Sequence, residues 1–387
     1  MLSVSPGRGA HVDPAVIATV PVGVEPDGVG VNPTTDRVYV ANFSSHSVSV
    51  LDGASNAVMA TVPSPLGAFP LGVGVNPTTD RVYVANAGTR NVSVIDGPSN
   101  AVIATVPVGR GPVGVGVNAT TDRVYVVSQS SGTVSVIDGA SNAVIATVPV
   151  GAGAVGIAVN PIIDRVYVVN AAAATVSVID GASNGVIAAI PVGSMPLGVG
   201  VNPAVGHVYV ANRYDDTVSV IDGGSNAIIA TVAVGVEPGG VGVNPTTDRV
   251  YVSNRLDNTV SVIDGASNGV IATVPVGGDP RSVGVNPTTD RVYVANAWDD
   301  TVSIIADAST PTPTPTATPS PTATPTPAPT AIPPPIAVGG IVEVRTDTDV
   351  LPAQDAGSDD DSTVVVAPVI ALALIAIAAV WYARRRG

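Results

Sequence analysis

Residues 113–148 read VGVGVNATTDRVYVVSQSSGTVSVIDGASNAVIATV. This stretch separates into four short apolar runs, Val113–Asn118, Arg123–Val127, Thr133–Asp138 and Ala143–Val148. Valine and isoleucine dominate the runs, and β-branched side chains suit the pleated surface of a sheet. The stretch therefore predicts four strands, which we call A, B, C and D in chain order.

These strands are expected to be buried on both faces. In strand B, Val124 and Val126 lie on one face and Tyr125 lies on the other, so neither face is polar. A sheet with this pattern is covered on both sides. Strand A carries Gly114 and Gly116, and small residues suit an innermost position where backbones approach closely.

The same unit recurs along the chain, and its tyrosine marks each copy. Successive tyrosines are 42 residues apart, except for a first interval of 44, and the seven are Tyr39, Tyr83, Tyr125, Tyr167, Tyr209, Tyr251 and Tyr293. Seven copies of a unit of about forty residues, each with several strands, are typical of a β-propeller with one blade per copy. The predicted fold is thus all-β and seven-bladed.

The strand order predicts how the ring closes. A D-type segment, Ala15–Val20, precedes the first A strand, whereas the last A–B–C triplet, Ser282–Ile305, has no D strand after it. We expect the N-terminal strand to complete the seventh blade beside Thr301–Ile305, which would leave no open sheet edge at the junction.

The repeated sequence motifs support a family resemblance. Strand B ends in Tyr-Val-(Ala/Val/Ser)-(Asn/Ser), is preceded by NPTTDRV and is followed by TVSVIDG, over residues 12–306. This pattern resembles the YVTN repeat family of β-propellers. The resemblance implies a seven-bladed propeller of the kind found in exported and surface-layer-associated microbial proteins, and it carries over no catalytic residues. Blade five departs from it, because Gly206-His207 replaces the usual Asp-Arg.

The composition changes after the propeller. A Pro/Thr-rich stretch at 307–335 predicts a disordered polyproline-type linker, and an acidic juxtamembrane segment follows at 336–363. Residues 364–382 carry no charge and predict a transmembrane helix, and the basic tail 383–387 marks the cytoplasmic side. The prediction is a single-pass membrane protein with an extracellular propeller.

The N-terminus and the linker leave questions open. Residues 1–21 lack the pattern of an export signal, so we expect the true start to lie upstream of Met1. A tail-anchored protein is the alternative. Glycosylation of the linker and processing of the anchor remain open.

Composition excludes several functions. The chain has no cysteine and a net charge of −14, which argues against thiolate chemistry and nucleic-acid binding. Two Gly-x-Gly-x-x-Gly matches, at 109–114 and 151–156, fall between blades, where no helix follows to bind a dinucleotide. The three histidines are scattered. No cofactor and no metal is expected, and the repeated Asp-Arg pairs are expected to be structural, with an ionic rim at one end of the ring.

Binding residues are sought where the repeats disagree. The B–C and D–A loops share one end of the ring, and they vary most in blades five to seven. Tyr, Trp and Arg there are typical of binding hot spots, although repeat drift explains the same variation. The predicted partner-binding residues are Arg213, Tyr214, Asp215, Arg255, Asp257, Arg281, Trp298 and Asp299.

Three functions follow from these features. The leading prediction is a surface-displayed recognition or structural module, monomeric and without enzymatic activity, that binds a protein or a glycan. One alternative is an extracellular lactonase- or lyase-type enzyme on the propeller scaffold. The other is a purely structural surface-layer component.

Overall fold

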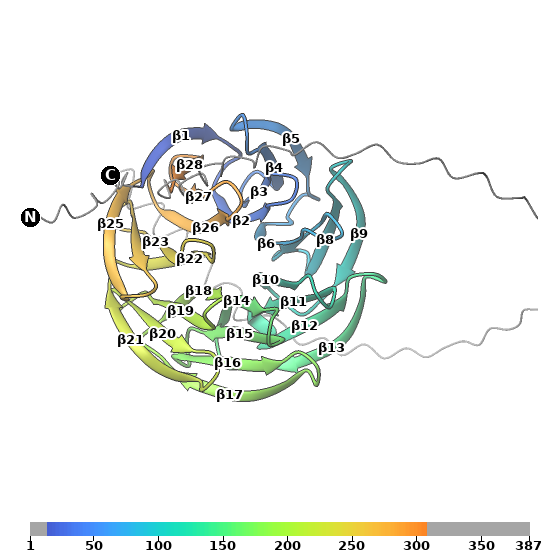
Figure 1. Ribbon diagram of the computed structural model, residues 1–387. Helices are drawn as coiled ribbons and strands as arrows, with labels where there is room; N and C mark the ends of the chain where they lie inside the picture. Colours follow the sequence, from blue (N-terminus) through green and yellow to red (C-terminus); the bar gives the residue numbers. More distant parts are fainter. Residues whose placement is uncertain (1–13, 308–387) are drawn as a thin grey trace, which may run out of the picture. The chain divides into compact units, whose positions relative to one another are not determined.

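The computed structural model describes residues 14–307, which form seven four-stranded antiparallel sheets. Figure 1 shows these sheets arranged as the blades of a ring, with the first strand of each blade innermost and the fourth outermost. The predicted all-β, seven-bladed propeller is thereby confirmed. The predicted linker, transmembrane helix and basic tail lie outside the described residues. Within residues 14–307, no helix is long and apolar enough to cross a membrane.

The blades have closely similar strand bounds. Blade one contains β2 (Pro26–Asn32), β3 (Arg37–Asn42), β4 (Ser47–Asp52) and β5 (Ala57–Pro63). Blade two contains β6 (Pro70–Asn76), β7 (Arg81–Asn86), β8 (Asn91–Asp96) and β9 (Ala101–Pro107). Blade three contains β10 (Pro112–Asn118), β11 (Arg123–Ser128), the short 3₁₀ turn η1 (Gln129–Ser131), β12 (Thr133–Asp138) and β13 (Ala143–Pro149). Blade four contains β14 (Ala154–Asn160), β15 (Arg165–Asn170), β16 (Thr175–Asp180) and β17 (Gly185–Pro191).

The remaining blades follow the same plan. Blade five contains β18 (Pro196–Asn202), β19 (His207–Asn212), β20 (Thr217–Asp222) and β21 (Ala227–Ala233). Blade six contains β22 (Pro238–Asn244), β23 (Arg249–Asn254), β24 (Thr259–Asp264) and β25 (Gly269–Pro275). Blade seven contains β26 (Pro280–Asn286), β27 (Arg291–Asn296), β28 (Thr301–Ala306) and, as its outer strand, β1 (Ala15–Pro21).

Ring closure follows the predicted route. Strand β1 pairs antiparallel with β28, from Ala15 opposite Ala306 to Pro21 opposite Thr301 (Figure 1). Asp307 follows directly and forms an ion pair with Arg249 of blade six, although its own side chain is fully buried. The junction therefore joins blade seven both to the N-terminus and to its neighbour.

The core lies between blades. In the B strands every residue after the first is buried, and the seven repeat tyrosines are fully buried. One typical cluster joins Tyr39 and Val50 of blade one to Val82, Val84 and Ile95 of blade two. Blades thus cover one another on both faces, which explains why strand B is apolar on both sides.

Outer strands are protected by bulges. In each D strand the register against strand C shifts by one residue, for example between Val136 and Ile137 of blade three. Such a bulge twists an edge strand and discourages pairing with another chain.

The end of the ring that carries the A–B and C–D turns, which we call the turn face, joins neighbouring blades by two repeated contacts. In six of the seven described junctions the last Asn of strand A donates to the turn Asp of the next blade, at 2.6–3.0 Å. In five of the six blades where strand B begins with Arg, this Arg donates to a backbone carbonyl in the next blade, as Arg37 does to Gly97. The Asp–Arg repeat therefore acts mainly through neutral partners across the blade junctions, and the ion pair of Arg249 with Asp307 is the exception among these arginines in the described residues.

Candidate functional site

The opposite end of the ring, which we call the variable-loop face, holds the start of every A strand. Each A strand has a bulge after its first residue, so that in blade one Pro26 pairs with Asn42 but the next paired residue is Val29. The two bulged residues lie on the wall of a hollow of about 470 Å³. Bulges commonly redirect side chains next to functional sites, and in this ring the same bulge occurs in every blade.

The first bulged residue of each blade defines what we call the mouth ring. Its seven members are Asp27, Leu71, Val113, Val155, Leu197, Gly239 and Arg281. Six of the positions one residue further on are glycine, and a Cβ at Gly28 would lie 2.1 Å from the carbonyl oxygen of Leu71. The A strands therefore approach so closely that only small residues fit at that level. Blade seven alone has a side chain there, Ser282.

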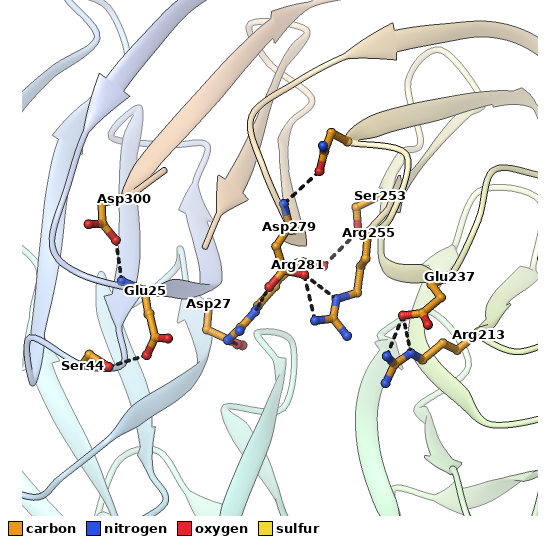
Figure 2. A network of polar contacts seen from close by, with 11 residues as sticks. Glu25, Asp27, Ser44, Arg213, Glu237, Ser253, Arg255, Asp279, Arg281 and Asp300 are labelled. Atoms are coloured by element: carbon orange, nitrogen blue, oxygen red, sulfur yellow. Dashed lines mark hydrogen bonds and ion pairs between the residues drawn. The ribbon is translucent and has the colours of Figure 1, made fainter. Parts of the chain in front are cut away.

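A chain of charged side chains occupies one sector of the mouth. Arg281 donates through Nε to Asp279 and through Nη1 to Asp27, at 3.0 Å each. Arg255 donates through Nε and Nη2 to Oδ1 of the same Asp279, at 2.9 and 2.8 Å. Figure 2 shows Arg281 between the two aspartates, with Arg255 approaching Asp279 from the neighbouring blade. Two guanidinium groups and two carboxylates make this cluster neutral.

Asp279, which both arginines contact, is itself held in place. Asp279 is buried, with 2% of its surface exposed, and its backbone N–H donates to Asn258. Burial lowers the pKa of Arg281, but the charges of Asp27 and Asp279 outweigh this effect and keep its pKa above the usual value. Arg281 is thus a cation at neutral pH, held in place by two carboxylates.

Local sequence departures make room for this arrangement. A Cβ on Gly239 would lie 3.1 Å from Cδ of Arg255, so a side chain at this mouth-ring position would crowd the arginine. Ser253 stands where other blades have Ala or Val, and its hydroxyl donates to the carbonyl oxygen of Arg281 at 2.9 Å. The hydroxyl also accepts from the N–H of Gly240 at 2.8 Å.

Each arginine of the cluster keeps one Nη group beside the hollow that has no protein acceptor among the described residues. Within residues 14–307, Nη2 of Arg281 and Nη1 of Arg255 have no protein acceptor, and both residues line the hollow. Asp27 also lines it and is about one quarter exposed, at 28%. The mouth thus offers two cationic donors and one carboxylate to a bound molecule. Within the same residues, no group of three His, Cys, Asp or Glu side chains is placed to hold a metal ion.

Of the eight residues predicted to bind a partner, Arg255 and Arg281 line the hollow. The three aspartates clamp loops instead, because Asp215, Asp257 and Asp299 each accept a 2.7 Å hydrogen bond from the D–A loop that enters their own blade. Arg213 pairs with Glu237 of blade six and lies over the Tyr214 ring, 5.5 Å from its centre. Four of the eight predicted residues, the three aspartates and Arg213, therefore have a structural role in holding the loops.

Two aromatic residues of the prediction remain accessible. Tyr214 is 63% exposed and Trp298 is 38% exposed, both on the variable-loop face. They lie on B–C loops and do not line the hollow.

Sequence reasoning missed the carboxylates of the cluster. Asp27 lies at the start of a strand and Asp279 in a D–A loop, whereas seven of the eight predicted binding residues lie in B–C loops. Comparison of the seven mouth-ring positions would have found the signal, because Asp27 and Arg281 are adjacent around the ring and are the two charged members of an otherwise apolar or glycine set.

Comparisons with known proteins agree with this fold. The chain matches the family described as "Lactonase, 7-bladed beta-propeller" over residues 15–329, and it belongs to that family. No curated protein sequence matches the chain. A chain of the Kuenenia stuttgartiensis hydrazine synthase is similar in structure, with a TM-score of 0.66 and 20% identity over 78% of this chain and 99% of that one.

A second similar structure comes from the mitotic checkpoint complex. Its TM-score is 0.68, with 14% identity over 79% of this chain and 96% of that one. At such low identity both structures support the fold alone. The particular resemblance to YVTN repeats stays a prediction.

Family membership corrects one expectation. The sequence was interpreted as that of a protein without enzymatic activity, because its repeat positions build blades and no catalytic constellation was evident. The lactonase family match contradicts this interpretation and points to an enzymatic propeller. The Arg–Asp cluster in the hollow is assembled from three blades and has no local sequence motif.

Proposed function

We propose that the protein hydrolyses lactones at the mouth ring, with Arg255, Arg281 and Asp27 as the residues that act on the substrate. The observation that carries this proposal is the cluster of two arginines and a carboxylate in the central hollow of a lactonase-family propeller. Enzyme sites are commonly concave, with a few converging polar groups in an otherwise apolar wall, and the hollow fits that description.

The arginines provide the electrophilic part of the site. A lactone carbonyl oxygen placed in the hollow would accept hydrogen bonds from the unused Nη atoms of Arg255 and Arg281. Water attack turns this oxygen into an oxyanion, and fixed cationic donors stabilise the developing charge. Asp279 holds both guanidinium groups in place before the substrate arrives, so little reorganisation is needed during the reaction.

Asp27 provides the base. Its carboxylate lines the hollow beside Arg281 and can accept a proton from a water molecule that attacks the carbonyl carbon. When the ring C–O bond breaks, the same proton passes to the leaving oxygen, and the product is a hydroxy acid. At neutral pH the new carboxyl group ionises and releases one proton to the solvent, which gives a direct assay.

The test is a pH-stat measurement with the purified full-length chain and a panel of five- and six-membered lactones at pH 7.5. The expected result is proton release above the spontaneous rate for at least one class of lactone. The absence of turnover throughout the panel, by protein whose thermal melt shows it to be folded, would refute the proposal.

A second proposal concerns where the ring works. We propose that the propeller is displayed outside the cell on the Pro/Thr-rich linker, anchored through residues 364–382, and that its variable-loop face also recognises a surface protein or a glycan. The uncharged stretch in the sequence supports the anchor, and the exposed Tyr214 and Trp298 support recognition. Protease added to intact cells should release the propeller. Protection in intact cells combined with cleavage in lysates would contradict this topology.

A further inference from the structure

The mouth ring has two chemically different sides. Its charged members are Arg281 of blade seven and Asp27 of blade one, and Arg255 fills the space beside Gly239 of blade six. The four consecutive blades two to five contribute aliphatic side chains at the same level, namely Leu71, Val113, Val155 and Leu197. All four are half-buried, so part of each side chain is open to the hollow.

Neither the wall nor the floor of the aliphatic side supplies a polar side chain. Beneath the mouth ring, blades two to five have glycine and then Val or Ile, and these residues complete the lining of the hollow there. A ligand rich in hydroxyl groups would lose its hydrogen bonds to water against this surface without replacement, which costs free energy. An aliphatic chain would instead remove apolar surface from water on both partners.

We infer that the hollow takes an amphipathic ligand, specifically a lactone with an aliphatic substituent, whose ester group lies on the charged sector of blades six, seven and one while its alkyl chain lies on Leu71, Val113, Val155 and Leu197. This inference rests on the proposed function for the choice of a lactone. The neutral charge of the cluster agrees with an uncharged head group. The size of the hollow, about 470 Å³, accommodates a ring of five or six atoms together with a chain of several carbons.

Binding can be measured apart from turnover with lactams, which resist hydrolysis under these conditions. Isothermal titration calorimetry of the full-length chain with 5-methyl-, 5-propyl- and 5-hexyl-pyrrolidinone gives affinity as a function of chain length. Each methylene that enters the hollow should tighten binding about twofold to fourfold, and the heat-capacity change should become more negative with length. Equal affinity for the three lactams would overturn the inference.

A pair of variants locates the alkyl chain. Leu71→Ala combined with Leu197→Ala should lower the affinity for the hexyl lactam about tenfold. The affinity for the methyl lactam should stay within about twofold, because the head group keeps its partners. The matched control is Val58→Ala combined with Val186→Ala, which removes half-exposed aliphatic side chains from two outer strands. Equal losses for both double variants, or a loss that is independent of chain length, would place the alkyl chain elsewhere.

The two proposals fail in different ways. Binding that depends on chain length, without hydrolysis of the corresponding lactones, supports the amphipathic site and refutes the proposed activity. Hydrolysis with the same KM for alkylated and unsubstituted lactones supports the activity and refutes the amphipathic site. Tight binding of a polyhydroxylated lactone such as glucono-δ-lactone, in preference to an alkyl lactone, also refutes it.

Discussion

Blade five is the weak junction of the turn face, and restoring its missing residues should stabilise the ring. Gly206-His207 stands where six other blades have Asp-Arg. Asn160 of blade four therefore lacks the carboxylate that its equivalents contact, and Nδ1 of His207 is buried without a hydrogen-bond partner among the described residues. The double change Gly206→Asp with His207→Arg would rebuild both contacts.

The size of the gain follows from the other blades. A hydrogen bond to a charged group contributes about 1.5–3 kcal/mol when well buried, and these contacts are only partly buried, so about 1 kcal/mol each is a fair expectation. Gly206 has φ +77°, and the six equivalent aspartates adopt φ of 47–53°, so the backbone accepts Asp there at a cost of about 1 kcal/mol. The net gain is about 1 kcal/mol, or a rise in Tm of about 2–4 °C.

Thermal unfolding followed by circular dichroism measures this gain, with Gly132→Asp as the matched control. Gly132 has φ +63° and an equally open Cβ position, but it lies on the variable-loop face, away from the Asn–Asp contacts. The control should give no increase in Tm. An unchanged or lower Tm for the double variant, or an equal rise for the control, would show that the Asn–Asp contacts do not stabilise the turn face.

Three further predictions concern closure, pH and recognition. Deletion of residues 1–22 removes β1 and exposes the edge of β28, so we expect a lower Tm or strand-exchanged oligomers, whereas a clean monomer with an unchanged melt would contradict the closure. Burial, together with nearby carboxylates, raises the pKa of Tyr209 to about 12. Tyr209 therefore does not lower the free energy of unfolding below about pH 10, but between about pH 10 and 12 only the unfolded state loses the proton, and the free energy of unfolding should fall by on the order of 2–3 kcal/mol. Alkaline titration followed by circular dichroism should show Tyr209→Phe unfolding at higher pH than the wild type, and identical midpoints would refute this. In a glycan and surface-protein binding screen, Trp298→Ala or Tyr214→Ala should weaken the binding free energy of a partner on the variable-loop face by about 2 kcal/mol, while Ser131→Ala should hardly change it. Binding that survives the Trp298 and Tyr214 changes together would exclude this surface as the binding site.

The sequence was sufficient for the architecture because every blade repeats the same local information. Strand positions, the buried tyrosines and the closure by β1 all follow from periodicity and turn chemistry, and the structure confirms each of them. The main difference is at strand A of blade three, which was predicted to begin at Val113 but begins at Pro112. Pro112 pairs with strand B, and a bulge follows it.

The site was harder to predict because it depends on residues that meet across the ring. Asp27 and Arg281 are separated by 254 positions, yet they pair because the chain closes on itself. The aspartates Asp215, Asp257 and Asp299 were assigned a binding role from their variability, but within the structure they fasten loops. Variation between repeats therefore pointed to the face that holds the hollow and to two of the residues that line it, Arg255 and Arg281.

The central claim is that the charged sector of the mouth ring performs lactone hydrolysis, and Asp27→Asn tests it most directly. This change keeps the shape of the side chain and removes the base, so kcat/KM for the best lactone should fall about 100-fold or more, with thermal stability nearly unchanged. The control, Asp138→Asn, alters a carboxylate in an exposed turn on the opposite face and should leave kcat/KM within about twofold of the wild type. An Asp27→Asn protein that retains wild-type kcat/KM would contradict the account, because Asp27 would then not be the base that the hydrolysis requires.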